Sequence, residues 1–190
     1  MKNFLTGLIT GMLLFGVVGF AIATPVQWTT ASGGNGHLYE IVVSNLSWEN
    51  AQNTAVAAGG YLATITSAEE QAFIENLLTQ YTSPGVGGFM IGGSQLSGSA
   101  EPTDGWQWVT GEAWSYTNWG GSEPSNGGGS EGYLYVDERY AWGWNDYFNE
   151  STYYNPVGYI FESAPVPEPA TMMLFGIGLL SLAGVSRRKK

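Results

Sequence analysis

Three carboxylates and one amide lie close together in a short part of this sequence. Glu123 and Glu131 belong to the stretch GGSEPSNGGGSEG, and Asn145 and Asp146 follow a few residues later in the triplet Trp-Asn-Asp. Calcium takes six to eight oxygen ligands from carboxylates, amides, backbone carbonyls and water. Glycine lets a loop wrap around such an ion. The pattern therefore predicts either a calcium site or, as the plain alternative, a solvated acidic loop.

The spacing also limits which kind of calcium site this is. An EF-hand takes its ligands from twelve consecutive residues, and these four residues are spread more widely. Without a cation, converging carboxylates raise one another's pKa, and a divalent ion removes that cost. Pro124 restricts the loop backbone, and a cis bond before it would fix one turn geometry. We therefore expect a calcium site formed by a long loop, and not an EF-hand.

Catalytic chemistry is less well supported by the same residues. Glu123 and Glu131 could form a glycosidase pair, but both lie in a glycine-rich loop and not on rigid elements. The chain has no cysteine, which excludes disulfides, cysteine nucleophiles and structural Cys zinc sites. The only histidine, His37, lies at a predicted strand edge far from the loop, so no Ser-His-Asp arrangement is predicted. We expect that the protein is not an enzyme.

The elements that must position the loop follow from hydrophobic periodicity and capping signals. Ser47 begins a predicted helix with Trp48, Ala51, Ala55 and Ala58 on one face, and Gly59-Gly60 ends it. Ser67 begins a second helix, where Glu70 completes a capping box. Strands are predicted at 37–43, 61–65, 88–93, 105–109, 133–138 and 157–162, with a loop at 110–132. Helices grouped before the later strands indicate an α+β fold.

Both ends of the chain look like targeting segments. Residues 1–23 combine Lys2, an apolar run and Ala-Ile-Ala, which predicts a signal peptide; an N-terminal membrane anchor is the alternative. Residues 165–190 contain Pro167-Glu168-Pro169, an apolar run at 170–186 and a basic end. On physical grounds this segment is a tail anchor. It also resembles the bacterial PEP-CTERM sorting signal. That resemblance implies export, processing by an exosortase near the Pro-Glu-Pro motif, and only a temporary membrane helix in a Gram-negative host.

The body between these ends, residues 24–164, reads as one domain of strongly acidic character. It contains one basic residue, Arg139, against fifteen acidic residues, a formal charge of −14. Such a surface repels nucleic acid and anionic membranes, so neither is an expected partner. We expect Arg139 to pair with Asp137 or Glu138 or to lie over a tryptophan, with ligand binding the less favoured role.

Residues 37–162 resemble a C-type lectin-like domain. The matching segments run in order along the chain: 47–74 for the two-helix region, FMIGG at 89–93, GWQWVTGEAWSYTNW at 105–119, Glu123-Pro124-Ser125, Glu131, and Trp144-Asn145-Asp146. The resemblance implies two helices packed on small antiparallel sheets with a long ligand loop. It also implies calcium held by Glu123, Ser125, Glu131, Asn145 and Asp146. Two neighbouring sugar hydroxyls would bind that ion, contacted by the same residues and by Asn126.

Two departures from the family pattern bear on the site. Ser125 stands where sugar-binding members carry an amide or acid, and serine offers no NH2 donor. By alignment, Ala55 and Phe161 stand at one usual disulfide pair, and Tyr133 and Asn149 at the other. We expect the first pair to be replaced by packing and the second to leave the loop less tethered. Tyr116, Trp119 and Trp142 are candidates for packing on a sugar, although core packing is the more favoured role.

The sequence thus predicts an exported, calcium-dependent carbohydrate-binding module at the cell surface or in the extracellular matrix. The alternative is the same fold used as a structural or protein-binding module without sugar binding, because a fold alone does not fix function.

Overall fold

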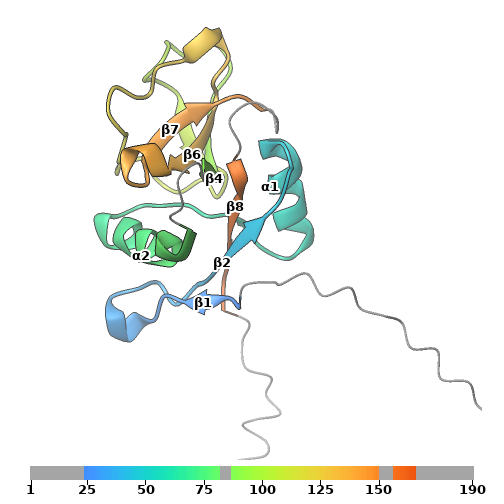
Figure 1. Ribbon diagram of the computed structural model, residues 1–190, viewed down its shortest axis with the longest axis vertical. Coiled ribbons are helices and arrows are strands. Elements are labelled where there is room, and N and C mark those ends of the chain that lie inside the picture. Colours follow the sequence, from blue (N-terminus) through green and yellow to red (C-terminus); the bar gives the residue numbers. More distant parts are fainter. Residues whose placement is uncertain (1–23, 82–86, 150–155, 166–190) are drawn as a thin grey trace, which may run out of the picture.

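The computed structural model describes residues 24–81, 87–149 and 156–165 (Figure 1). The predicted signal peptide, the Pro167-Glu168-Pro169 motif and the predicted apolar span at 170–186 lie outside these residues. Among the residues that are described, no helix is both long enough and apolar enough to cross a membrane.

An eight-stranded sheet connects the whole described domain. Its main path runs β1-β2-β8-β4-β6-β7, with β3 paired to β8 and β5 paired to β4. The strands are β1 (Val26–Gln27), β2 (Leu38–Val43), β3 (Tyr61–Leu62), β4 (Gly88–Gln95), β5 (Trp106–Trp108), β6 (Tyr133–Asp137), β7 (Gly143–Tyr147) and β8 (Pro156–Ser163). The α+β class is confirmed. The expected small antiparallel sheets are joined into one mixed sheet, because β4 and β8 pair in parallel.

Both predicted helices are present and begin at the predicted serine caps. In α1 (Trp48–Ala57), the Ser47 side chain accepts a hydrogen bond from the Asn50 N–H. Trp48, Ala51 and Ala55 are buried, but Ala58 is exposed because the helix ends one residue earlier. Gly59, with a φ of 87°, then turns the chain in the left-handed region that glycine tolerates.

The second helix, α2 (Ala68–Leu78), has only half of the predicted capping box. Ser67 accepts from the Glu70 N–H at 3.1 Å, as expected. The Glu70 carboxylate does not return to Ser67; it accepts from the Thr66 N–H at 2.8 Å and from the Tyr39 hydroxyl at 2.5 Å. The buried Tyr39 hydroxyl needs a hydrogen-bond acceptor. The Glu70 carboxylate provides it instead of completing the capping box. The described part of the chain also contains four short 3-10 helices: η1 (Thr30–Ser32), η2 (Thr79–Tyr81), η3 (Gly127–Gly129) and η4 (Glu138–Tyr140).

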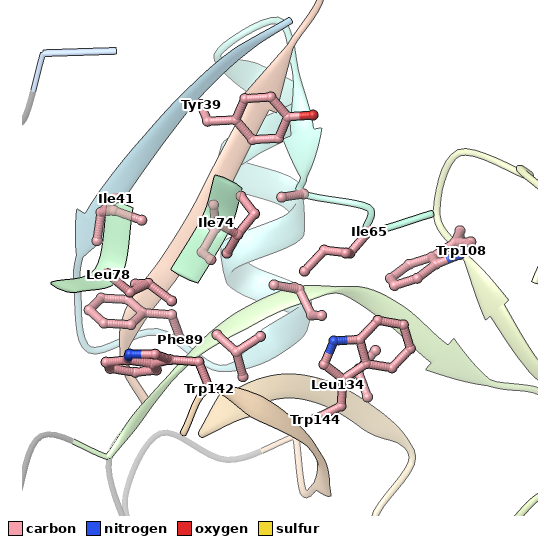
Figure 2. Packing of buried hydrophobic residues seen from close by; sticks show 14 of the residues in the cluster. Tyr39, Ile41, Ile65, Ile74, Leu78, Phe89, Trp108, Leu134, Trp142 and Trp144 are labelled. Carbon is pink, nitrogen blue, oxygen red and sulfur yellow. The ribbon is translucent and has the colours of Figure 1, made fainter. Parts of the chain in front are cut away.

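A core of aromatic and aliphatic residues fixes the position of β7, the strand that carries the Trp-Asn-Asp triplet (Figure 2). Trp144 is fully buried, and its indole N–H donates to the Gln71 side-chain oxygen at 2.8 Å. The ring of Trp108 meets it edge-on at 5.5 Å. Since one buried tryptophan is held by both α2 and β5, its neighbours in β7 have little freedom to move.

Packing and hydrogen bonds stand where the family usually has disulfides. Ala55 and Phe161 belong to the same hydrophobic cluster, which confirms the expected packing substitute. The second pair converges on the first residues of α1: the Tyr133 hydroxyl donates to the Glu49 carboxylate at 3.0 Å, and the Asn149 side-chain oxygen accepts from the Glu49 N–H at 3.1 Å. The end of the loop region is therefore tied to α1 through Glu49, a connection that the sequence did not indicate.

Candidate functional site

The pairing of β6 with β7 sets the base of the site. In this antiparallel register Tyr135 lies opposite Asn145, and Leu134 lies opposite Asp146. Strand β7 was not predicted, because Gly, Asn and Asp are all depleted in strands. Its pairing with β6 and the burial of Trp144 decide its conformation instead.

The glycine-rich loop is fastened to β7 at its beginning. The Gly120 N–H donates to the Trp144 carbonyl at 2.8 Å, and the Trp144 N–H donates to the Asn118 carbonyl at 2.7 Å. The Glu123–Pro124 peptide bond is cis, as the sequence indicated. Asn126 has a φ of 48°, in the left-handed region that asparagine tolerates better than most residues. The loop is thus positioned backbone to backbone before it reaches its acidic residues.

Asp146 and Asn126 hold the loop in its folded path. Asp146 is 1% exposed, and its two carboxylate oxygens accept the backbone N–H groups of Ser125 at 3.0 Å and Asn126 at 2.7 Å. The Asn126 side-chain oxygen accepts from the Glu131 N–H at 3.1 Å. The Glu131 carboxylate accepts from the Gly127 N–H. These contacts close the loop with protein groups alone, and ligand roles for Asp146 and Asn126 stay predictions.

A pocket of about 510 Å³ opens beside this loop. Four of the predicted site residues line it: Glu123, Ser125, Glu131 and Asn145. Asp146 and Asn126 do not. The other residues in its wall were not predicted as site residues: Ser130, Tyr135, Arg139, Tyr140, Tyr147 and Phe148. The alternation of Tyr133, Tyr135 and Asp137 in the sequence puts Tyr135 on one face of a strand. It would have identified Tyr135 as a site residue only if the pairing of this strand with β7 had been known.

None of the three aromatic residues proposed from the sequence lines this pocket. Trp142 is 6% exposed and packs against Phe89 at 6.2 Å. Tyr116 and Trp119 both pack edge-on against Trp144, with ring centroids at 5.6 and 5.9 Å. Core packing, the more favoured interpretation, is confirmed for all three.

Two carboxylates of the site, those of Glu131 and Asp146, have a raised pKa. Burial, followed by the charges of Asp146 and Glu123, raises the pKa of Glu131 to about 7. Burial is also the largest cause of the raised pKa of Asp146, to which the Glu123 charge contributes, although backbone hydrogen bonds, including those from Ser125 and Asn126, act in the opposite direction. Negative charge is therefore concentrated here at an energetic cost that a cation would relieve.

The donor atoms have the chemistry that calcium requires. Glu123 has one carboxylate oxygen held by the Tyr140 hydroxyl at 2.9 Å, while the other is buried with no hydrogen-bond partner in the described part of the chain. The Asn145 NH2 group donates to the Tyr135 hydroxyl at 2.7 Å, and no contact of the described residues occupies its amide oxygen. Across the described ranges, no three acidic or histidine side chains form a cluster that could hold a metal ion. The oxygen donors of Glu123, Glu131, Asn145 and Ser125 are nevertheless of the type that binds calcium. These four residues are the candidate ligands.

A hydrogen-bonded network lies beneath Asn145. The Tyr135 hydroxyl accepts from Asn145 and donates to the buried Asp137 carboxylate at 2.9 Å. Burial acts to raise the pKa of Asp137, but hydrogen bonds from Arg139 and Tyr135 outweigh it and lower the pKa overall. The expected ion pair of Arg139 with Asp137 is confirmed, and the guanidinium lies over the ring of Tyr140, not over a tryptophan.

Comparison with known proteins identifies the class that this fold and site represent. Residues 44–155 match the family model of the Lectin C-type domain, so the protein belongs to the C-type lectin domain family. Residues 165–190 match the PEP-CTERM protein-sorting motif, which indicates export and sorting in Gram-negative bacteria.

Curated relatives agree with this family assignment. Ladderlectin of Oncorhynchus mykiss is 30% identical over 104 residues, which cover 53% of this chain and 50% of the relative. C-type lectin domain family 4 member A of Mus musculus is 30% identical over 124 residues, which cover 64% of this chain and 48% of the relative. The chain thus spans about half the length of these relatives.

Solved structures share the fold. The C-type lectin CEL-I from Cucumaria echinata matches with a TM-score of 0.56 and 23% identity, over 67% of this chain and 89% of that one. A calcium-independent type II antifreeze protein matches with a TM-score of 0.57 and 22% identity, over 77% of this chain and 98% of that one. At these identities the likeness is one of fold, and the second of these two proteins is described as calcium-independent.

Proposed function

We propose that the protein is an exported carbohydrate-binding module that binds its sugar in the pocket beside the glycine-rich loop and depends on calcium to do so. The observation that carries the proposal is the second carboxylate oxygen of Glu123, which is buried without a hydrogen-bond partner. A buried, unpartnered acceptor is costly, and a bound cation would supply the missing interaction. Three further predicted ligands line the same pocket.

The residues of the pocket have distinct roles in this proposal. Calcium, when bound, would supply direct coordination of two neighbouring sugar hydroxyls. Glu123 and Glu131 would accept hydrogen bonds from those hydroxyls, since charge-assisted bonds fix orientation well. Tyr135 holds the NH2 group of Asn145, which leaves the amide oxygen for the ion. Tyr147 and Phe148 provide the aromatic wall on which the apolar face of a sugar would pack.

In the same proposal, the module acts outside the cell, and the match of its C-terminal segment to a sorting motif supports this. Pro167-Glu168-Pro169 would be the site of exosortase processing, and residues 170–186 would anchor the protein in the membrane until then. The module would end at the cell surface or in the extracellular matrix, where polysaccharide is the natural ligand class. We propose binding without catalysis, because Glu123 and Glu131 lie on the loop and not on rigid elements.

One observation favours a second candidate, a structural or protein-binding module. The Asp146 carboxylate is already satisfied by two loop N–H groups, so the loop is closed without an ion. A structural module would require no more than this.

Calorimetric titration of calcium into the full-length protein, in a detergent without a sugar headgroup, tests the proposal. We expect a dissociation constant between about 0.1 and 1 mM, the range of extracellular modules. Glu123→Gln and Glu131→Gln should each weaken binding by about tenfold or more, because each removes one charged ligand. Glu69→Gln, an exposed acid on α2, is the matched control and should bind as the wild type does.

Glycan binding with calcium and with chelator then separates the two candidates. No calcium binding would leave the structural module as the better account.

A further inference from the structure

Arg139 is the one basic residue of the body, and it lies in the wall of the candidate pocket. Its side chain is 59% exposed, whereas that of its ion-pair partner Asp137 is fully buried. The pocket is otherwise lined by the acids Glu123 and Glu131 and by polar and aromatic residues. The only fixed positive charge of the described domain is therefore located at its candidate binding site.

The guanidinium group is held rigidly along one edge. Its Nε donates to both carboxylate oxygens of Asp137, at 3.1 and 3.0 Å. Its Nη2 donates to Asp137 at 2.5 Å and to the Tyr135 hydroxyl at 3.0 Å. No hydrogen bond of the described residues uses Nη1. Because an arginine carries two N–H bonds on that nitrogen, two donors remain available on a group whose position is already fixed.

Arg139 is linked by contacts to both sides of the site. On one side the Tyr135 hydroxyl accepts from Arg139 and also from Asn145. On the other side the guanidinium lies 5.7 Å from the centre of the Tyr140 ring, and the Tyr140 hydroxyl donates to Glu123. Arg139 is therefore connected, through Tyr135 and Tyr140, to two of the residues that would hold calcium and sugar.

The pairing with Asp137 alone does not account for this arrangement. Neutralising a buried carboxylate needs only the edge formed by Nε and Nη2, and Nη1 takes no part in it, although Arg139 lies in the wall of a pocket that Glu123 and Glu131 also line. An arginine so placed suits a ligand oxyanion, since hydrogen bonds between guanidinium and carboxylate or sulfate are strong and directional. A neutral sugar would make little use of its charge.

We propose that Arg139 makes the pocket selective for acidic sugars, which carry a carboxylate or a sulfate ester near the hydroxyls that bind the calcium. This inference rests on the proposed function. The hydroxyls would be bound by the calcium and its ligands, and the oxyanion by Nη1 of Arg139. The ligand class is thus an acidic polysaccharide, such as one that contains uronic acids or sulfated sugars.

The test compares sugars that differ only in charge. The probes are trisaccharides of mannuronate, glucuronate and galacturonate, each with its neutral methyl ester, and a sulfated trisaccharide with its unsulfated counterpart. Binding to the full-length protein is measured at constant ionic strength, with calcium and with chelator. We expect at least one acidic probe to bind about tenfold more tightly than its neutral partner, because a hydrogen bond to a charged group contributes that much. The two sets of probes distinguish a carboxylate from a sulfate.

The variant must not leave the buried Asp137 without its partner, which would destabilise the fold. The double variant Asp137→Asn, Arg139→Gln removes both charges together, and its thermal unfolding confirms that it folds. We expect the ratio of acidic to neutral affinity to fall to about one in this variant. Arg139→Lys keeps the positive charge but loses the planar guanidinium group, so it should retain part of the preference for acidic over neutral probes.

The outcomes separate the inference from the function on which it rests. If acid and ester bind the wild type equally, or if the preference survives in the double variant, Arg139 does not select the ligand. If, in either of these cases, Glu123→Gln abolishes the binding of both the acid and the ester, the proposed function still stands. If no probe binds in the presence of calcium, the proposed function fails and this inference fails with it.

Discussion

The single histidine of the chain has a structural partner well away from the candidate site. His37 Nδ1 lies 2.7 Å from a carboxylate oxygen of Glu162, which is 1% exposed. The Tyr61 hydroxyl donates to the same oxygen at 3.2 Å, and the single Tyr39 hydroxyl proton is shared between this oxygen, at 3.1 Å, and Glu70, at 2.5 Å. The Thr64 N–H donates to the other Glu162 oxygen at 3.0 Å. Glu162 therefore joins β2, β3 and β8 through hydrogen bonds. His37, for which no functional role was expected, has a structural one.

Glu162 should give the stability of the protein a characteristic pH dependence. Burial raises the pKa of Glu162 above its ordinary value of 4.5, although the hydrogen bonds from His37 and Thr64 oppose this. The folded state then binds more protons than the unfolded state between the two pKa values. The contribution of Glu162 to the free energy of unfolding is thus greatest below pH 4.5 and declines as pH rises through the raised pKa.

Thermal unfolding between about pH 4 and pH 7 tests this expectation. Glu162→Gln should lower the melting temperature at every pH, because its NH2 group would face donors, but it should also flatten the decline with rising pH. Glu69→Gln, an exposed acid, should keep the wild-type slope. Parallel curves for the wild type and Glu162→Gln would contradict the role assigned to burial.

At the scale of elements, the second missing disulfide is replaced by two hydrogen bonds to one residue. Tyr133 at the start of β6 and Asn149 after β7 both contact Glu49 at the start of α1. The helix thus joins the two ends of the region that a bridge would have closed. Hydrogen bonds at a partly exposed position contribute less than a disulfide, so this region remains the weaker part of the fold.

Removing one of these hydrogen bonds should have a small, measurable effect. Tyr133→Phe should lower the free energy of unfolding by about 0.5–1.5 kcal/mol, the usual contribution of one hydrogen bond. Chemical denaturation measures it. Tyr116→Phe is the matched control, since no hydrogen bond of the Tyr116 hydroxyl is present among the described residues, and it should change stability by less than about 0.5 kcal/mol. An equal loss in both variants would mean that the Glu49 contact contributes nothing.

The loop at 120–132 should be protected from proteolysis by calcium. Without the ion, the charges of Glu123, Glu131 and Asp146 repel one another, and the glycines offer little resistance to opening. A glutamyl endopeptidase should then cut after Glu131 faster in chelator than in calcium. Cleavage after the exposed Glu112 serves as the internal control for the enzyme. Equal rates after Glu131 in both conditions would show that the loop is not ordered by calcium.

At the scale of the whole molecule, charge is distributed very unevenly. The body carries fifteen acidic residues and one arginine, a formal charge of −14. Self-repulsion of this size weakens the compact state, and salt screens it over a distance of about 10 Å at 0.1 M ionic strength. The acidic pocket adds to this repulsion, so calcium and salt should both stabilise the protein, by different mechanisms.

Raising sodium chloride from about 50 to 500 mM in the presence of chelator should therefore raise the melting temperature. The physical reason is screening, so choline chloride at the same ionic strength should produce a similar increase. Calcium at millimolar concentration should produce a further increase that Glu123→Gln reduces. A melting temperature that does not change with either salt would show that self-repulsion is unimportant here.

The sequence by itself determined the features that depend on residues a few positions apart. The serine caps at Ser47 and Ser67 are hydrogen bonds to residues three positions further on, and Gly59 marks the end of α1 through its own backbone conformation. Alternation along β6 likewise predicted a strand with Leu134 and Val136 on one face, although Tyr135 and Asp137 on the other face are buried as well. Glu123 and Asn145, which line the candidate pocket, were likewise predicted as ligands from the sequence, through the order of the family motifs.

The tertiary structure decided everything that joins distant residues. Strand β7 exists because Trp144 is buried and β6 pairs with it, not because its residues favour a strand. The carboxylate of Asp146 binds loop N–H groups twenty and twenty-one positions away, and Arg139 is linked to Asn145 through Tyr135 and Asp137. Such contacts depend on strand register and core packing, which are properties of the whole chain. Local periodicity carries no information about them, because it reports only on neighbours along the sequence.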